Sequence, residues 1–202
     1  PRVSALEMFN FIESELLEIA DQMMPAQANE YGRADQVAAW TLLAKLYLNA
    51  EVYIGQSKYT ECLTYSNKII ESSYGLAPTW EQLFWANNDM DNTTMQEIIF
   101  PVRFDGRRTQ TNGGTTFISN ASIGGNMAAD EYGFPGDNGG WGGTRVTPEF
   151  VAKFDDNPDD ARAVFFTDGQ NLSIDDINVF TDGYAYPKFV NYYIKDDGEK
   201  IN

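Results

Sequence analysis

Glycine is distributed very unevenly along this chain of 202 residues. Ten of its 17 glycines fall between Gly113 and Gly143. Because glycine loses more conformational entropy than other residues when it joins a helix or a strand, this stretch disfavours long regular elements. We therefore expect residues 105–145 to form a long glycine-rich loop and the regular core of the protein to lie elsewhere.

The first 25 residues carry a strong helix pattern. Ser4 is followed three residues later by Glu7, which is the spacing of a capping box, and Pro25 marks the end of the pattern. Apolar residues recur between these limits at spacings of three and four, which places them on one face of a helix. They are Phe9, Ile12, Leu16, Ile19 and Met23.

A helical hairpin is predicted to follow, with helices over about 34–50 and 58–72 separated by Gly55. The segment "WTLLAKLY" matches the first helix of a tetratricopeptide repeat, in which a small residue lets the partner helix approach. The matching residues are Trp40, Leu43, Ala44 and Tyr47. A generic helical hairpin would carry the same residues, so both interpretations stay open.

Shorter elements are expected beyond the helices. A turn of helix is predicted around Trp80, and "EIIFPVRF" alternates apolar residues as a strand does, although Pro101 favours an edge or a bulge. Another strand is predicted at "AVFFTDG". The expected fold class is mainly α with irregular loops and short strands, divided into a helical region at 1–78 and a loop-rich region at 79–202.

Composition excludes several classes of function. The chain has no histidine, which removes the usual general base and the commonest zinc ligand. Its net charge of −16 repels nucleic acid. No loop has a trusted metal-ligand spacing, so neither a metal nor a cofactor is predicted. No apolar run reaches the roughly 20 residues of a membrane span.

The glycine-rich loop combines its glycines with aromatic and amide side chains. Flexible linkers are poor in aromatics, whereas an aromatic ring can stack on the apolar face of a sugar and amides can bond its hydroxyl groups. Trp141, in "GDNGGWGGTR", is the most conspicuous ring. It could contact a ligand, or it could turn inward and anchor the loop, and the sequence leaves both readings open.

The chain as a whole resembles a known family. The run "YGRADQVAAWTLLAKLYLNAEVYIGQSKYTECLTYSNKIIESSYGL" is similar to the helical core of SusD-like (RagB/SusD) nutrient-binding outer-membrane lipoproteins, with a Gly-Arg-Ala opening the first helix. The resemblance continues through "EIIFPVRF", "GGTTF", the loop with Trp141 and "FDDNPDDARAVFFTDG". It implies a SusD-like α fold built on tetratricopeptide-like helical hairpins, and a chain that is an internal fragment of a longer protein.

The resemblance also implies a function. Such proteins bind an oligosaccharide at the cell surface without turning it over, and deliver it to a SusC-like TonB-dependent transporter in the outer membrane. Attachment would be through an N-terminal lipid that is absent from this chain. The expected glycan-binding residues lie in the glycine-rich loop. Trp141 and Tyr132 would stack on sugar rings, and Asn138, Asp137 and Arg145 would bond hydroxyl groups.

Two other functions are compatible with parts of the sequence. A glycoside hydrolase would need paired carboxylates, and the densest acidic cluster is formed by Asp155, Asp156, Asp159 and Asp160. Their crowding in one short turn favours a solvated bend instead. A tetratricopeptide-type adaptor would bind a protein partner through the helices, but it would need more helical repeats than the glycine-rich half allows.

Overall fold

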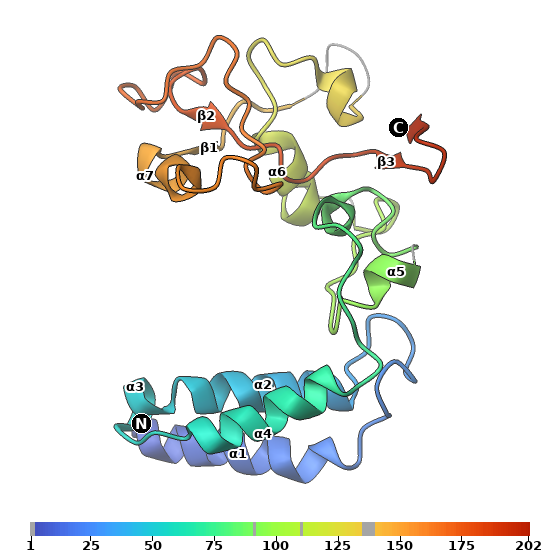
Figure 1. Cartoon of the computed structure of the whole chain (residues 1–202), viewed down its shortest axis with the longest axis vertical. Helices are drawn as coiled ribbons and strands as arrows, with labels where there is room; N and C mark the ends of the chain where they lie inside the picture. Colours follow the sequence, from blue (N-terminus) through green and yellow to red (C-terminus); the bar gives the residue numbers. More distant parts are fainter. Residues whose placement is uncertain (1–2, 91, 110, 135–139) are drawn as a thin grey trace. The chain divides into compact units, whose positions relative to one another are not determined.

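The computed structural model describes residues 3–90, 92–109, 111–134 and 140–202 (Figure 1). The chain divides into two compact units, which are described separately. The helical unit comprises Pro1–Ala77 and Asn92–Arg103, and the loop-rich unit comprises Pro78–Asp91 and Phe104–Asn202. The chain therefore passes from the helical unit to the loop-rich unit after Ala77, returns to the helical unit at 92–103 and then leaves it again.

Three helices lying side by side form most of the helical unit (Figure 1). The middle helix in the packing order is α2, which contacts both α1 and α4. The elements of this unit are α1 (Ala5–Ala20), α2 (Gln36–Leu48), α3 (Ala50–Ile54), α4 (Tyr59–Ile70) and α5 (Asn92–Met95). The helix predicted over 34–50 thus ends at Leu48, and the separate short helix α3 follows before Gly55.

Local side-chain chemistry fixes where these helices begin. The predicted capping box is present: Glu7 N–H donates to Ser4 Oγ at 3.2 Å, and Ser4 N–H donates to Glu7 Oε2 at 2.8 Å. Asp35 caps α2 by accepting from the amides of Val37 and Ala38. Each cap satisfies backbone donors that a helix start would otherwise leave unpaired.

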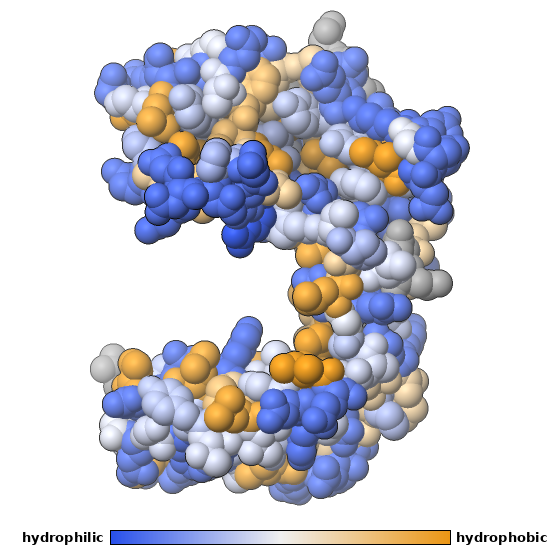
Figure 2. Space-filling view, viewed as in Figure 1, coloured by the Kyte–Doolittle hydropathy of each residue, from blue (hydrophilic) through white to orange (hydrophobic). Residues whose placement is uncertain are grey.

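The core of the helical unit lies between α1 and α2. Leu43 and Tyr47 of the tetratricopeptide-like pattern are buried in it, whereas Ile12 and Ile19 of the predicted α1 stripe are 36% and 42% exposed. The buried members are Phe9, Leu16, Ala20, Ala39, Leu43, Leu46, Tyr47 and Ala50. Further apolar residues lie on the surface of these helices, among them Leu63 on α4. Figure 2 shows hydrophobic patches on this unit.

The loop-rich unit contains short elements only. They are η1 (Glu81–Phe84), α6 (Gly114–Ala121), η2 (Ala129–Tyr132), β1 (Arg145–Val146), α7 (Pro148–Val151), η4 (Ala152–Phe154), β2 (Tyr184–Ala185), β3 (Tyr193–Ile194) and β4 (Lys200–Ile201). Strand β1 pairs antiparallel with β2, and β3 pairs antiparallel with β4. A small core of Ile123, Met127, Phe134 and Ala185 holds the unit together.

Two sequence-based expectations for local structure are wrong. Residues 97–104 were expected to form a strand, but the backbone there consists of turns, bends and irregular chain. Period-two alternation does not make a strand without a pairing partner, and Pro101 also removes an amide donor. The strand expected at "AVFFTDG" is reduced to a single bridge between Phe166 and Ala185.

The glycine-rich region is more regular than its composition suggests, because it contains the two-turn helix α6. Gly114 opens this helix at φ +58, and a Cβ at this position would collide with the ring of Phe104. Glycine is therefore needed here to let an aromatic ring pack against the helix start. The mainly helical class with a few short strands is as predicted.

Candidate ligand-binding site

An exposed pair of aromatic rings is the main feature of the glycine-rich region. Phe117 projects from α6, and Trp141 lies on the segment that follows η2. Their ring centroids are 6.2 Å apart and their planes are tilted by 57°. Each residue is 47% exposed. The pair therefore presents two adjacent, solvent-exposed aromatic rings on which a ligand can pack.

The backbone of the Trp141 segment is bonded to the end of α6. Four successive amides donate to carbonyl groups in the last turn of α6 or just beyond its end. The bonds are Trp141 to Asn120 at 2.8 Å, Gly142 to Ile123 at 2.9 Å, Gly143 to Ala121 at 2.8 Å and Thr144 to Ala121 at 2.7 Å. Helix and segment thus act as one support for the two rings.

Glycine makes this close approach possible. Gly140 has a φ of +89, and a Cβ there would overlap the Ile123 carbonyl group. On the other side of the contact, a Cβ on Gly124 would lie 2.6 Å from the Gly142 Cα. Two backbones meet here with no room for side chains, which explains why Trp141 is flanked by glycines.

The Trp141 ring has one polar group. Its Nε1–H finds no acceptor among the residues that the structure describes. An indole that stands half exposed beside Phe117 can therefore supply both a stacking face and a hydrogen-bond donor to a ligand.

Tyr132, the second predicted stacking residue, has a different environment. It is half-buried against the small core that contains Phe134, and burial raises the pKa of its phenol. Its carbonyl accepts from the Asn191 amide. Within the described ranges, no ring contact joins Tyr132 to Trp141; the neighbour of Trp141 is Phe117.

Arg145 is held by three backbone carbonyl groups. Its Nε donates to Asp182 O at 2.8 Å, and its two terminal nitrogens donate to Gly143 O at 2.9 Å and Ile177 O at 2.8 Å. The guanidinium also lies over the Phe180 ring, 5.7 Å from its centroid. Two of its five N–H groups remain for a ligand hydroxyl. These contacts give Arg145, the first residue of β1, a bracing role.

Asp137 and Asn138, the other predicted hydroxyl partners, lie outside the described residues. Phe117 is the residue that sequence reasoning did not place in the site. The signal was present in "GGTTF", but the two glycines before it favoured a loop, and without a helix there was no reason to bring Phe117 to Trp141.

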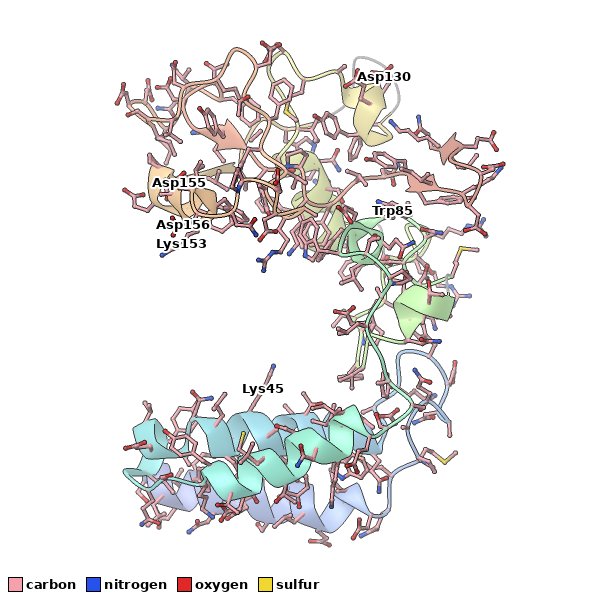
Figure 3. The ribbon with its side chains drawn as sticks, viewed as in Figure 1. Lys45, Trp85, Asp130, Lys153, Asp155 and Asp156 are labelled. Atoms are coloured by element: carbon pink, nitrogen blue, oxygen red, sulfur yellow. The ribbon has the colours of Figure 1, made fainter. Side chains whose placement is uncertain are left out.

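The acidic turn beyond η4 carries the carboxylates that a glycoside hydrolase would have to use as its pair. Figure 3 shows Asp155 and Asp156 beside Lys153 at the end of η4. Asp160 accepts two hydrogen bonds from the Arg162 guanidinium and one from the Arg162 backbone N–H, and these bonds lower the pKa of its carboxyl to about 2. The general acid of a glycosidase needs a raised pKa to hold a proton near neutrality. The pKa of Asp160 is lowered, so this carboxyl is unsuited to that role.

Neither a metal site nor a membrane-spanning helix is found among the described residues. In the described part of the chain, no cluster of three or more cysteine, aspartate or glutamate side chains is arranged to hold a metal ion. Among the helices of those same ranges, none has the length and apolar character that a bilayer crossing requires.

A known protein is similar to most of this chain. Over 157 residues, 76% of its length, the chain is 41% identical to the starch-binding protein SusD of Bacteroides thetaiotaomicron. The chain is SusD-like. It spans about a quarter of the relative that it matches, since the aligned residues cover 27% of that SusD. No protein-family model matches the chain. The name of this SusD relative describes binding rather than a reaction.

Proposed function

We propose that this chain contributes to glycan binding through a platform made of Phe117 and Trp141. The observation that carries the proposal is the exposed ring pair itself, with centroids 6.2 Å apart and both residues 47% exposed. Sugar rings present apolar C–H faces and hydroxyl rims, so they suit a surface that offers aromatic faces and a nearby N–H donor.

Similarity to a starch-binding relative supports this choice over other ligands with flat apolar faces. It favours a glucose polymer as the first glycan to test. Tyr132, Asp137, Asn138 and Arg145 remain proposed contributors, with Tyr132 restricted by its burial and Arg145 by its three carbonyl partners.

Delivery to a TonB-dependent transporter, and a place on the outer-membrane surface, are also part of the proposal. Both are supported by the similarity to the SusD relative. They are proposals, because the aligned part of this chain covers only 27% of that protein. Binding without turnover is expected, since a receptor that passes its ligand to a pore has no use for hydrolysis.

Calorimetric titration with a soluble starch oligosaccharide tests the platform. Wild-type protein should bind, and Trp141→Ala should lose at least tenfold in affinity, which is the scale expected for removing a central aromatic contact. Trp85, which directly follows η1, supplies a matched control, because Trp85→Ala removes an indole from outside the platform. Equal binding by the wild type and Trp141→Ala would contradict the proposed platform, and release of reducing sugar would favour a hydrolase instead.

A further inference from the structure

The helical unit contains a cavity that is separate from the ring pair. Its volume is about 330 Å³, and all of its lining residues belong to this unit. It lies where the chain enters α2 and where residues 95–101 return to the helices. Ligand pockets in proteins begin at roughly this volume.

One wall of the cavity is fixed by a close contact between Gly32 and Arg103. Gly32 has a φ of +87, and a Cβ there would lie 2.6 Å from Arg103 Cδ. The absence of a side chain lets Arg103 lie over the Tyr31 ring, 5.4 Å from its centroid, and donate to the Tyr31 carbonyl. Because the guanidinium covers this face of Tyr31, that face is not available for stacking.

The base of the cavity is organised by Asp35, which is 1% exposed. Its Oδ2 accepts from the Gln27 amide at 2.8 Å and from the Tyr74 hydroxyl at 2.7 Å, while Oδ1 caps α2. Gln27 is held at φ +58, an uncommon conformation for a residue other than glycine. Such strain persists only where surrounding contacts enforce it, so the wall is preorganised.

The charges at the cavity are already paired within the protein. The Asp35 carboxylate has protein donors on both oxygens, and Arg33 pairs with Glu30 at 3.0 Å. The remaining polar groups include the side-chain amides of Gln27 and Gln96, which make no hydrogen bond to other described residues. Amides both donate and accept, as hydroxyl groups require, and they carry no charge.

The lining also includes Asn29, and its apolar side chains are Met95, Ile98, Ile99 and Pro101. A cavity of about 330 Å³ equals the liquid volume of about eleven water molecules, and one hexose has about as many non-hydrogen atoms. We propose that this cavity binds a single uncharged sugar residue, edge-on against the aliphatic wall. The choice of a sugar over other neutral polyols rests on the proposed function, but the cavity is a site distinct from the Phe117 and Trp141 platform.

Amide NMR titration of the whole chain with D-glucose tests this site, because it reads the two sites separately. The Gly32 amide reports on the cavity, and the Trp141 indole N–H reports on the platform. A saturable Gly32 shift is expected, with a dissociation constant on the order of millimolar for a ligand this small. Gluconate, of similar size but carrying a carboxylate, should bind at least tenfold more weakly.

Substitutions then locate the site. Gln96→Trp should fill the cavity and weaken the glucose-dependent Gly32 shift at least tenfold. Gln56→Trp, the same change at an exposed residue outside the lining, should leave it unchanged, as should Trp141→Ala. If Gln96→Trp does not fold, intermolecular nuclear Overhauser effects from glucose to the Ile98 and Ile99 methyl groups of the wild type decide the matter.

Several results would overturn the cavity site. They are a Gly32 amide that does not shift, a shift that survives in folded Gln96→Trp, equal binding of gluconate, or loss of the shift in Trp141→Ala. If Gly32 is silent while oligosaccharide still moves the Trp141 indole, the cavity site fails and the proposed function stands. If the indole is silent and Gly32 responds, the platform fails and the cavity site stands.

Discussion

The Trp141 amide donates a 2.8 Å hydrogen bond to the Asn120 carbonyl, near the end of α6. Asn120 is one turn along the helix from Phe117, so the bond that holds Trp141 also sets its distance from Phe117. Ring separation at the proposed platform is thus controlled by the backbone, and changes to either ring should alter binding without altering the support.

Phe117→Ala should weaken glycan binding about tenfold or more, because the platform loses one of its two faces. The fold should be little affected, since the ring is 47% exposed. Ile118→Ala is the matched control, as Ile118 is the neighbouring exposed apolar residue on α6. Calorimetry gives the affinities and circular dichroism checks the fold. Equal losses in the two variants would show that Phe117 has no specific role.

Gly140→Ala should destabilise the loop-rich unit by roughly 3 kcal/mol, because the new Cβ overlaps the Ile123 carbonyl in addition to the strain of a positive φ. Gly198→Ala is a control with a similar φ of +86 and open space around the Cβ, and it should cost only about 1 kcal/mol. Urea unfolding measures both values. Equal midpoints would mean that the contact with Ile123 relaxes freely.

Arg145→Lys separates bracing from ligand binding. Lysine cannot reach three carbonyl groups in the fork geometry of a guanidinium, so the free energy of unfolding should fall by roughly 2 kcal/mol. If bracing is the main role of Arg145, glycan affinity should change less than threefold at a temperature where the variant is folded. A large loss of affinity with unchanged stability would instead make Arg145 a ligand contact.

Asp35→Ala should cost the helical unit roughly 3 kcal/mol, since it removes the α2 cap and leaves the Tyr74 hydroxyl and the Gln27 amide without their acceptor. Asp35→Asn keeps a capping oxygen and should cost less. Thermal unfolding of the two variants provides the measurement. A larger loss in Asp35→Asn than in Asp35→Ala would contradict the capping role.

The Asp160 and Arg162 pair predicts an acid-dependent contribution to stability. Arg162 lowers the folded pKa of Asp160 to about 2, below the ordinary value of 3.8. The contribution is therefore complete above about pH 4 and is lost as the pH falls from there towards 2. Carboxyl carbon NMR should give this low pKa in the wild type and a higher pKa in Arg162→Ala, which keeps the backbone N–H donor but loses the guanidinium. An unchanged pKa would contradict the pairing.

Much of the helical unit could be predicted from sequence because its signals are local. The Ser4 and Glu7 capping box and the burial of Leu43 and Tyr47 follow from spacing alone. Exposure of Ile12 and Ile19 could not be read from the same spacing, because periodicity defines a face of a helix but does not say what covers it.

The candidate site was predictable only in part, since it depends on a contact between distant segments. The density of glycines predicted the region of the site, and Trp141 was predicted as a stacking residue within it. The partner ring, Phe117, required a helix that opens on two glycines, against their propensity. The carbonyl partners of Arg145 come from turns remote in sequence, and no residue pattern announces backbone acceptors.

The four amides bonded to the end of α6 have a consequence for exchange with solvent. Amides in glycine-rich segments are usually expected to exchange their hydrogens rapidly, but exchange at Gly142 and Gly143 requires these bonds to open. Deuterium uptake there should therefore be slow and should accelerate together with uptake at the end of α6. The glycine-rich segment around Trp141, whose composition suggests high flexibility, would therefore be among the last parts of the loop-rich unit to exchange its amide hydrogens.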